Sequence, residues 1–497
     1  MKEHIRPADI DRFRGGIVHC LGLQFEDAKL GFLADVLRRR LDVARDAPDV
    51  YLTRLETENR GGDEAGALSQ ELTVPETYFF RNNEQYRAFA DVALPDRMRA
   101  QIAVRRLRIL SAGCASGDEA YSLAVLVREA VIDPSWDVSI LGVDVNPAMV
   151  NKARRARFSE WALRQTPADV RSRWFRREGK DFVLDEAVQS AVRFEERNLV
   201  RDDAQLWHPD TYDIIFFRNV LMYFTPENAH AVIARIGRAL RVGGYLFLGH
   251  AETLRGLSND FHLRHTHETF YYQLKDPLER PRGPSLAALG GVEADTWFDT
   301  IRLATERVEI LTRSPPPPPR AGSPAAAARP AWTLEAVHEL LQEERFTEAL
   351  ETLQRLPPEA GRDPDVLLLR AALLTHRGQL AEAEEACARL LNVDELSAGA
   401  HYLLALCREG VRDLTGAENH DQVAIYLDPG FAMPHLHLGL LARRAGNRAT
   451  AQDELRQALL LLEREDRLRV LLFGGGFSRE ALVALCRTEL MGAGGTA

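Results

Sequence analysis

The 497-residue sequence is poor in cysteine, in long apolar runs and in clustered histidine. Its five cysteines form no C-x-x-C pair, which indicates free thiols in a reducing compartment rather than a disulfide framework. No apolar run is long enough to span a membrane and residues 1–7 do not read as a signal peptide, so we expect a cytoplasmic chain without direct membrane insertion. The fourteen histidines form no ligand cluster, so we expect no metal site.

The sequence also lacks an excess of positive charge. It carries 63 Lys and Arg against 73 Asp and Glu, which gives a formal net charge of −10. A general nucleic-acid binder needs a basic surface to meet phosphates, so we expect no nucleic-acid partner. A chain of 497 residues is too long for one hydrophobic core, and several domains are therefore expected.

The most informative stretch that is present reads RILSAGCASGDEAYSLA, residues 108–124. A strand-like apolar run is followed by a turn with Gly113 and Gly117 and then by helical spacing, the first unit of a doubly wound α/β fold. Asp118 and Glu119 suit the helix start as caps, but they also repel phosphate and attract a cation. A ligand with an ammonium or sulfonium group therefore fits better than a dinucleotide, although a glycine turn alone is as easily structural.

An acidic residue ends the next predicted strand. Residues 138–143, VSILGV, are apolar and β-prone, Asp144 follows them, and Asn146 and Pro147 open another helix. An acid at the end of the second strand commonly holds a ribose diol. The alternative is a helix cap, because Asp-x-Asn-Pro caps well. The spacing from the glycine turn favours the ribose.

The last third of the chain repeats. Ala349, Ala383, Ala417 and Ala451 stand 34 residues apart. A 34-residue period with small residues at the tight helix crossings is typical of tetratricopeptide repeats, which bind peptides or helices in a concave groove. We therefore expect other signalling proteins to bind through this groove.

These patterns predict a multidomain chain. An all-α N-terminal domain precedes a Rossmann-like α/β domain with a small β insertion, and a Pro/Ala-rich linker leads to an α-helical solenoid of tetratricopeptide repeats. The expected boundaries, in chain order, are 1–95, 96–275 with the insertion at about 160–195, 276–330, and 331–497.

Residues 1–275 resemble the CheR family of chemotaxis receptor methyltransferases. The motifs that carry the resemblance are ETYFFR at 76–81, ASGDEAYSLA at 115–124, Asp144, NL at 198–199, FRNVLMYF at 217–224 and GGYLFLGHAE at 243–252. The resemblance implies S-adenosylmethionine as the cofactor and chemoreceptor cytoplasmic domains as partners. It implies a protein-glutamate O-methyltransferase, which converts receptor glutamate side chains to γ-methyl esters.

The resemblance also implies site residues. Its cofactor contacts fall on Pro75, Thr77, Arg81, Glu119, Asp144, Asn198, Leu199, Arg218 and Asn219. Pro75 stands where many relatives have Asn, so any side-chain contact there is lost. Glu119 would face the methionine ammonium and Asp144 the ribose hydroxyls. Arg81 and Tyr223 are the expected catalytic residues: Arg81 orients the carboxylate or the cofactor, and Tyr223 hydrogen-bonds near the methyl group, although packing would also explain Tyr223.

Two other functions remain open from the sequence. The chain could be a methyltransferase of the same cofactor class that acts on a small molecule or on RNA, although the acidic charge weighs against RNA. It could also be an interaction protein whose repeats matter and whose methyltransferase site is degenerate. The intact Glu119, Asp144, Arg81 and Tyr223 weigh against that reading.

Overall fold

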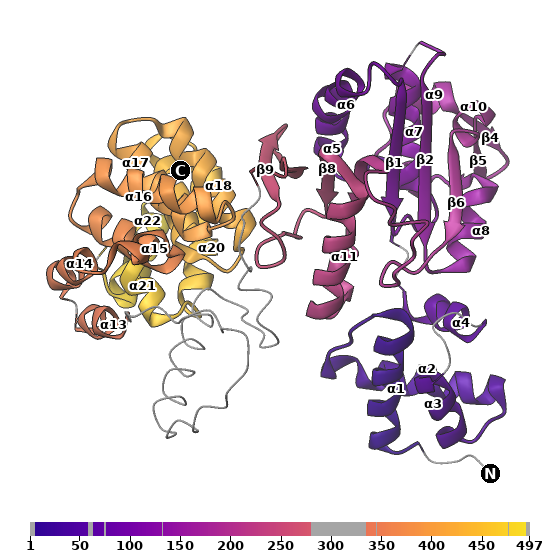
Figure 1. Cartoon of the computed structure of the whole chain (residues 1–497), viewed down its shortest axis with the longest axis horizontal. Helices are drawn as coiled ribbons and strands as arrows, with labels where there is room; N and C mark the ends of the chain where they lie inside the picture. The colour runs from indigo at the N-terminus through magenta and orange to yellow at the C-terminus, as the bar shows by residue number, and fades with distance from the viewer. Residues whose placement is uncertain are drawn as a thin grey trace, which may run out of the picture. The chain divides into compact units, whose positions relative to one another are not determined.

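The computed structural model describes residues 5–57, 63–73, 76–131, 133–279, 334–343, 345–475 and 477–493. The chain divides into two units, residues 1–282 and 283–497, each of which is described by itself (Figure 1). The expected linker lies outside the described residues from residue 280 onward. None of the helices in the described ranges combines the length and the apolar character that crossing a membrane requires.

The first unit begins with a small helical domain. Its helices are α1 (Pro7–Leu21), η1 (Asp27–Lys29), α2 (Leu30–Ala44), α3 (Pro48–Thr57) and α4 (Asp63–Leu72). Phe13, Ile17 and Leu37 lie in its core because they recur at helical spacing on facing sides of α1 and α2. α1 ends at Gly22, whose φ of 78° is the left-handed conformation that closes a helix.

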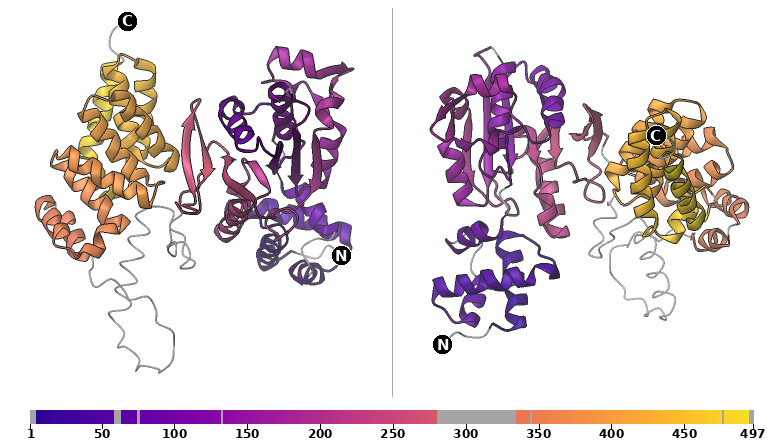
Figure 2. Two further views of the ribbon diagram at one scale, coloured as in Figure 1. Left: turned by 45° about the horizontal axis from the view of Figure 1, so that its top comes forward. Right: turned by 180° about the vertical axis from the view of Figure 1, so that it is seen from behind.

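A seven-stranded sheet forms the centre of the first unit. Its spatial order is β6 (Val192–Glu196), β2 (Asp137–Asp144), β1 (Arg106–Ala112), β7 (Tyr212–Phe217), β8 (Leu240–Leu248), β10 (Thr269–Leu274) and β9 (Phe261–Thr266). The strands from β6 to β8 are parallel, and β10 pairs with β8 in the antiparallel sense. Figure 2 shows the sheet flanked by helices, of which α7 (Asp118–Ala130), α8 (Pro147–Arg155) and α11 (Pro226–Ala239) follow β1, β2 and β7. This confirms the predicted Rossmann-like α/β fold.

The strand order places a topological switch point between β1 and β7, because the chain moves outward from β1 to β2 and β6 and then returns to β7 on the other side. Ligands of open α/β sheets bind at the carboxyl ends of the strands at such a point. β7 is buried along its whole length, which explains its uninterrupted apolar sequence YDIIFF.

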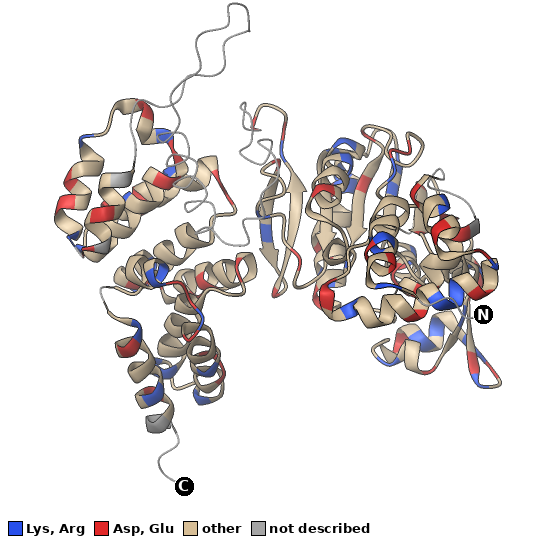
Figure 3. Cartoon of the chain, turned by 90° about the horizontal axis from the view of Figure 1, so that it is seen from below, with Lys and Arg blue, Asp and Glu red and all other residues tan. Residues whose placement is uncertain are grey.

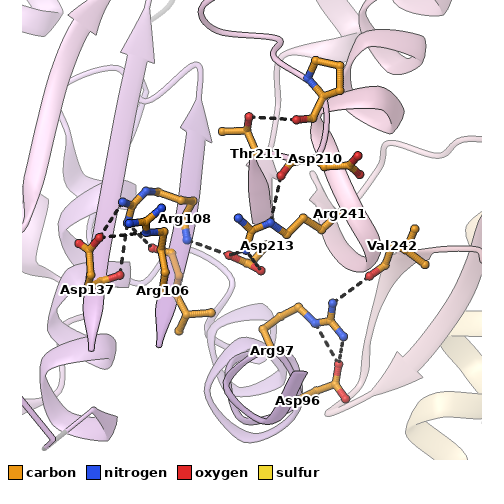
Figure 4. A network of polar contacts seen from close by, with 12 residues as sticks. Asp96, Arg97, Arg106, Arg108, Asp137, Asp210, Thr211, Asp213, Arg241 and Val242 are labelled. Carbon is orange, nitrogen blue, oxygen red and sulfur yellow. Dashed lines mark hydrogen bonds and ion pairs between the residues drawn. The ribbon is translucent and has the colours of Figure 1, made fainter. Parts of the chain in front are cut away.

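A polar network fixes the opposite, amino ends of the same strands (Figure 4). Asp213 is fully buried at the start of β7, and it accepts a hydrogen bond from the backbone N–H of Arg108 on β1 at 2.9 Å. Arg241 lies 3.3 Å from the Asp213 carboxylate, and Arg108 pairs with Asp137 on β2 at 2.8 Å. Burial raises the pKa of Asp213. The network ties β2, β1, β7 and β8 together at the edge away from the switch point.

A second, three-stranded sheet lies between β2 and β6 in the sequence. It has the order β3 (Arg157–Ser159), β5 (Asp181–Leu184) and β4 (Phe175–Glu178), accompanied by η3 (Trp161–Leu163), α9 (Ala168–Trp174) and α10 (Glu186–Gln189). The residues after 191, which the sequence pattern assigns to the insertion, form β6 and pair in parallel with β2 in the main sheet. Both kinds of strand are short and half-apolar, so the sequence alone does not separate them.

The helices that directly precede β1 pack against the seven-stranded sheet. α5 (Asn83–Ala88), η2 (Phe89–Ala93) and α6 (Leu94–Ala100) contribute Tyr86, Phe89 and Leu94 to the hydrophobic core that also contains Phe216 of β7. Within these N-terminal helices, the last buried residue of the helical domain's core is Leu72, short of the boundary at residue 95 that the sequence predicted. Helices on both sides of the irregular residues 76–82 extend to residue 100, so helical spacing alone does not mark where the first domain ends.

The second unit consists of antiparallel helix pairs. They are α13 (Glu335–Gln342) with α14 (Phe346–Gln354), α15 (Pro364–His376) with α16 (Leu380–Val393), α17 (Ala398–Gly410) with α18 (Leu414–Leu427), and α19 (Ala432–Arg444) with α20 (Arg448–Leu462). η6 (Pro358–Arg362) precedes α15, and α21 (Arg467–Phe473) and α22 (Arg479–Ala493) follow α20. The alanines at 34-residue spacing are all buried on the second helix of a pair, where a larger side chain would separate the helices.

Candidate active site

A cavity of about 690 Å³ lies at the carboxyl ends of β1, β2 and β7. This volume is in the range of about 300–1,000 Å³ that small-molecule and cofactor sites occupy. Eight of the nine expected cofactor residues and Tyr223 line it: Thr77, Arg81, Glu119, Asp144, Asn198, Leu199, Arg218, Asn219 and Tyr223. The ninth, Pro75, lies outside the described residues. Residues that are up to 146 positions apart in the sequence thus meet around one space.

The turn between β1 and α7 forms the floor of the cavity. Gly113 has a φ of 81°, and a Cβ there would stand 2.3 Å from Cγ2 of Val220 in the neighbouring loop. Gly117, with a φ of 87°, caps α7, and a Cβ there would stand 2.8 Å from Cβ of Ala153. Both positions therefore need glycine for conformation and for space. The glycine turn brings the start of α7, which carries Glu119, up to the cavity.

Glu119 and Arg218 form a buried ion pair in the cavity wall, with Arg218 Nη1 3.2 Å from Glu119 Oε2. Ser111 donates its hydroxyl to Glu119 Oε1 at 2.8 Å. Burial raises the pKa of Glu119, although Arg218 and Ser111 act in the opposite direction. The side chain of Glu119 keeps 13% exposure, and the cavity is the space it faces. The wall thus presents one anion and one cation side by side.

Arg218 also holds the segment that follows the helical domain. Its guanidinium donates to Arg81 O at 2.5 Å, Asn82 Oδ1 at 3.0 Å and Tyr86 OH at 3.4 Å. Arg81 itself donates to the carbonyl of Glu76 at 2.9 Å and lies 5.8 Å from the ring centre of Tyr78. The guanidinium of Arg81 is therefore anchored within its own segment at the cavity edge, with donors left for a ligand.

Asp144 ends β2 with both carboxylate oxygens fixed by backbone groups. Its Oδ2 accepts from the N–H of Ala115 in the glycine turn at 2.8 Å, and its Oδ1 accepts from the N–H of Asn146 at 2.8 Å. Asn146 rather than Asp144 caps α8, because its side chain accepts from the N–H groups of Ala148 and Met149. Asn146 therefore has the capping role that the sequence left open for Asp144. Each oxygen of Asp144 keeps a lone pair for a further donor. Burial raises the pKa of Asp144.

Asn198, which follows β6, bonds the region of the seven-stranded sheet to the helical domain. Its Nδ2 donates to the carbonyl of Cys20 at 3.0 Å, and its Oδ1 accepts from the N–H of Val200 at 3.1 Å. Leu199, which is 6% exposed, follows it in the wall. The side chain of Asn198 is thus engaged in structure, and its cavity surface and that of Leu199 contribute shape.

Glu252 organises the loop after β7, a role that the sequence did not reveal. Its Oε2 accepts from the N–H groups of Asn219 and Gly249, each at 2.7 Å, and its Oε1 accepts from Met222 at 3.3 Å. Asn219 has a φ of 59°, a conformation that needs support in a residue other than glycine. Burial raises the pKa of Glu252, although these backbone bonds oppose it. Its position after a strand, in GHAE, was the only sequence signal.

The helical domain supplies the outer wall, which the sequence also did not predict. Gln24 donates its N–H to the carbonyl of Tyr223 at 2.8 Å, and Leu23 forms a β-bridge with Phe224. Tyr223 in η4 (Leu221–Tyr223) is 39% exposed, and Phe32 of α2 is 41% exposed on the same cavity. The cavity thus has an apolar rim beside a charged interior.

The charges of the lining match a cation with a single negative group. Five acidic and three basic side chains face the cavity: Glu26, Glu71, Glu76, Glu119, Asp144, Lys29, Arg81 and Arg218. An adenosyl sulfonium bears two positive charges and one carboxylate, which suits an anion–cation pair with a further acid for the ribose. The fold and the site define an α/β protein that binds a positively charged nucleoside cofactor.

Residues 75–270 match the family described as "CheR methyltransferase, SAM binding domain". The "Probable biofilm formation methyltransferase WspC" of Pseudomonas putida is 30% identical over 435 residues, which cover 87% of this chain and 93% of that protein. The "Chemotaxis protein methyltransferase 2" of Vibrio cholerae is 31% identical over 279 residues, which cover 54% of this chain and 94% of that protein. The chain belongs to the CheR methyltransferase family.

For the repeats, a solved tetratricopeptide protein, TTC0263 of Thermus thermophilus, is 22% identical over 32% of this chain and 89% of that chain, with a TM-score of 0.25. This likeness is too weak to define the fold, and the helix pairs α13 to α20 define it by themselves. The cofactor of the chain is S-adenosylmethionine, and the chain is a methyltransferase of chemotaxis-like signalling.

Proposed function

We propose that the chain methylates glutamate side chains of chemoreceptor cytoplasmic domains to γ-methyl esters, the reaction of a protein-glutamate O-methyltransferase. The observation that carries the proposal is the cavity at the switch point, where the Glu119–Arg218 pair and Asp144 surround a space of cofactor size that opens beside Tyr223. The names of the related chemotaxis methyltransferases support it as well.

In this proposal Glu119 binds the methionine ammonium, Arg218 and Arg81 its carboxylate, and Asp144 the ribose hydroxyls. Thr77, Asn198, Leu199 and Asn219 complete the walls against the adenosyl group. When bound, S-adenosylmethionine supplies a methyl group that is already activated by its positive sulfur.

The acceptor needs little chemical help. A glutamate carboxylate with a pKa of about 4.3 is ionised at pH 7, so no general base is required. The chain's residues contribute alignment and exclusion of water, which together can supply much of the barrier reduction. In this proposal Tyr223, which is exposed at the rim, donates a hydrogen bond to the incoming carboxylate, and the exposed Phe32 and Met222 contact a receptor helix.

The competing functions differ in the surface they need. In the view of Figure 3, positive and negative residues are interspersed along the helices, a distribution that favours a protein acceptor over RNA. The retained ion pair and the buried Asp144 favour an active site over a degenerate one.

We further propose that the helical, catalytic and repeat parts act as separate domains, that the repeats select a signalling partner, and that the chain works in the cytoplasm, where receptor signalling domains lie. Removal of residues 331–497 should then spare methyl transfer to isolated receptor fragments and change the choice of partner in the cell.

The decisive experiment is incubation of the chain with methyl-labelled cofactor and receptor cytoplasmic fragments, followed by alkali. Carboxyl methyl esters release methanol in alkali, whereas N-methyl groups do not. Volatile label that depends on receptor glutamates supports the proposal. Stable label, or label transferred only to a small molecule or to RNA, contradicts it.

A further inference from the structure

The repeat array ends with a break in its order. α21 begins at residue 467, where the first helix of a fifth pair would start, 35 residues after α19. However, α22 packs along α20, and α21 lies against α15, the first helix of the second described pair (Figure 1). The first helices of successive pairs line the concave groove of such arrays, and α15 packs against α17, the first helix of the next pair. α21 therefore turns back into the groove instead of extending the stack.

The ring of Phe473, the last residue of α21, packs between Phe431 and Tyr402 in a space that we call the seat. Phe473 is 4% exposed, and its ring centre lies 5.1 Å from that of Phe431 and 6.0 Å from that of Tyr402. Gly399 of α17 forms the base of the seat, since a Cβ there would stand 2.9 Å from Cζ of Phe473. The groove thus has a glycine where the aromatic ring needs room.

Side chains of the groove also bond the end of α21. His376 Nε2 lies 2.8 Å from the carbonyl of Leu472, and the Tyr402 hydroxyl donates to the carbonyl of Phe473 at 3.2 Å. The last carbonyls of a helix have no partner within it, so buried ones need donors from outside. Burial lowers the pKa of His376, so the ring is neutral at pH 7 and Nε2 carries the proton.

The other end of α21 is held by charge. Arg469, which is 5% exposed, pairs with Asp428 at 2.5 Å, and its guanidinium lies 4.1 Å from the ring centre of Phe431. Planar guanidinium groups bind carboxylates and aromatic faces in this way with little loss of freedom. The groove therefore binds a short helix that has an Arg near its start and an aromatic residue at its end.

Contacts with other helices hold both ends of α21. A helix of seven residues is not stable by itself in water, so α21 depends on the groove. Gly475 in the connection to α22 has a φ of 64°, a conformation that glycine adopts readily, whereas Gly474 packs closely, since a Cβ there would stand 3.2 Å from Cδ1 of Leu482 in α22.

We propose that α21 is an internal ligand of the groove formed by α15, α17 and residues 428–431 before α19, and that a partner protein binds the same seat once α21 has left. The partner segment it fits is a short amphipathic helix with Arg near its start and Leu-Phe at its end. Because the groove is filled by the chain itself, partner binding is opposed until the internal helix is displaced. The proposal is independent of the methyl-transfer chemistry.

The test measures binding of a fluorescent peptide with the sequence of residues 464–475 to the full chain by anisotropy. The Phe473→Ser chain should bind the peptide at least tenfold more tightly than the wild-type chain, because its own helix no longer fills the seat. Phe477→Ser is the matched control, since Phe477 is 61% exposed and its chain should bind as weakly as wild type. A peptide that carries Phe473→Ser should bind none of the three chains.

Equal peptide binding by all three chains overturns the proposal, as does no binding to a Phe473→Ser chain that keeps the wild-type thermal transition. If that chain unfolds, Tyr402→Phe decides, because it removes only the hydroxyl that caps α21. Hydrogen exchange of amides 470–475 should then be at least fivefold faster than in wild type, while α18 exchanges as before. Unchanged exchange in that segment overturns the proposal.

Discussion

Asp144→Asn should weaken cofactor binding by about 10- to 100-fold while the chain remains folded. The carboxylate has two backbone N–H donors, one on each oxygen, and in our proposal it also accepts the two ribose hydroxyls. An asparagine amide nitrogen cannot accept, so one ribose bond and one backbone bond are lost. A hydrogen bond to a charged group contributes about 1.5–3 kcal/mol, and each 1.4 kcal/mol is about tenfold in affinity.

The stability change works in two directions. The N–H of Ala115 or Asn146 loses its acceptor, at a cost of about 1–3 kcal/mol. The substitution also removes a buried charge whose raised pKa shows that the ionised form is disfavoured in the folded state. The free energy of unfolding should therefore fall by no more than about 2 kcal/mol at pH 7.

The assay is calorimetric titration of the chain with S-adenosylhomocysteine, the demethylated product, alongside denaturant unfolding. Asp137→Asn is the control, because Asp137 begins the same strand at its other end and pairs with Arg108. Its affinity should be that of wild type. An unchanged affinity in Asp144→Asn, or an equal loss in both variants, would refute the ribose assignment.

Three further predictions concern other residues. Glu252→Gln should lower the free energy of unfolding by about 1–3 kcal/mol and reduce product affinity about tenfold, because backbone donors of the Asn219 loop lose their acceptor; denaturant unfolding and titration test this. Tyr223→Phe should lower kcat in the receptor-fragment assay and leave product affinity unchanged. Burial lowers the pKa of His437, but hydrogen bonds to Asp421 and Glu409 outweigh it and raise the pKa from 6.5 to about 9. The protonated ring therefore stabilises the fold fully below pH 6.5, and this stabilisation is lost as the pH rises through 9. His437→Gln should flatten that decline, which for a shift from 6.5 to about 9 amounts to about 3 kcal/mol, measured by thermal unfolding across this pH range.

Local patterns in the sequence predicted what local physics determines. The apolar strands, the glycine turn and the helical spacing of α1 and α7 follow from period and turn chemistry. The 34-residue spacing of alanines predicted the helix pairs because each alanine lies at a tight crossing within one pair. The site residues from Glu119 to Tyr223 line one cavity because their motifs follow the ends of adjacent strands, while Thr77 and Arg81 reach it from the segment after α4.

Contacts between distant segments escaped the sequence. The assignment of β6 to the main sheet depends on its pairing with β2, and the role of Glu252 depends on three N–H groups contributed by two loops. The pairing of Glu119 with Arg218 joins residues 99 positions apart. Neither periodicity nor spacing in the sequence predicts contacts between such distant residues, because the tertiary arrangement determines them.

The cavity is walled on one side by strand ends and on the other by the small helical domain, which touches it through Leu23, Gln24 and Phe32. These two sides come from different parts of the gene. Substitutions within the first seventy residues can therefore change the shape of the entrance without altering the strand ends that line the other side. Diversification of targets within the lineage should leave its mark on α1 and α2 before it reaches the strands.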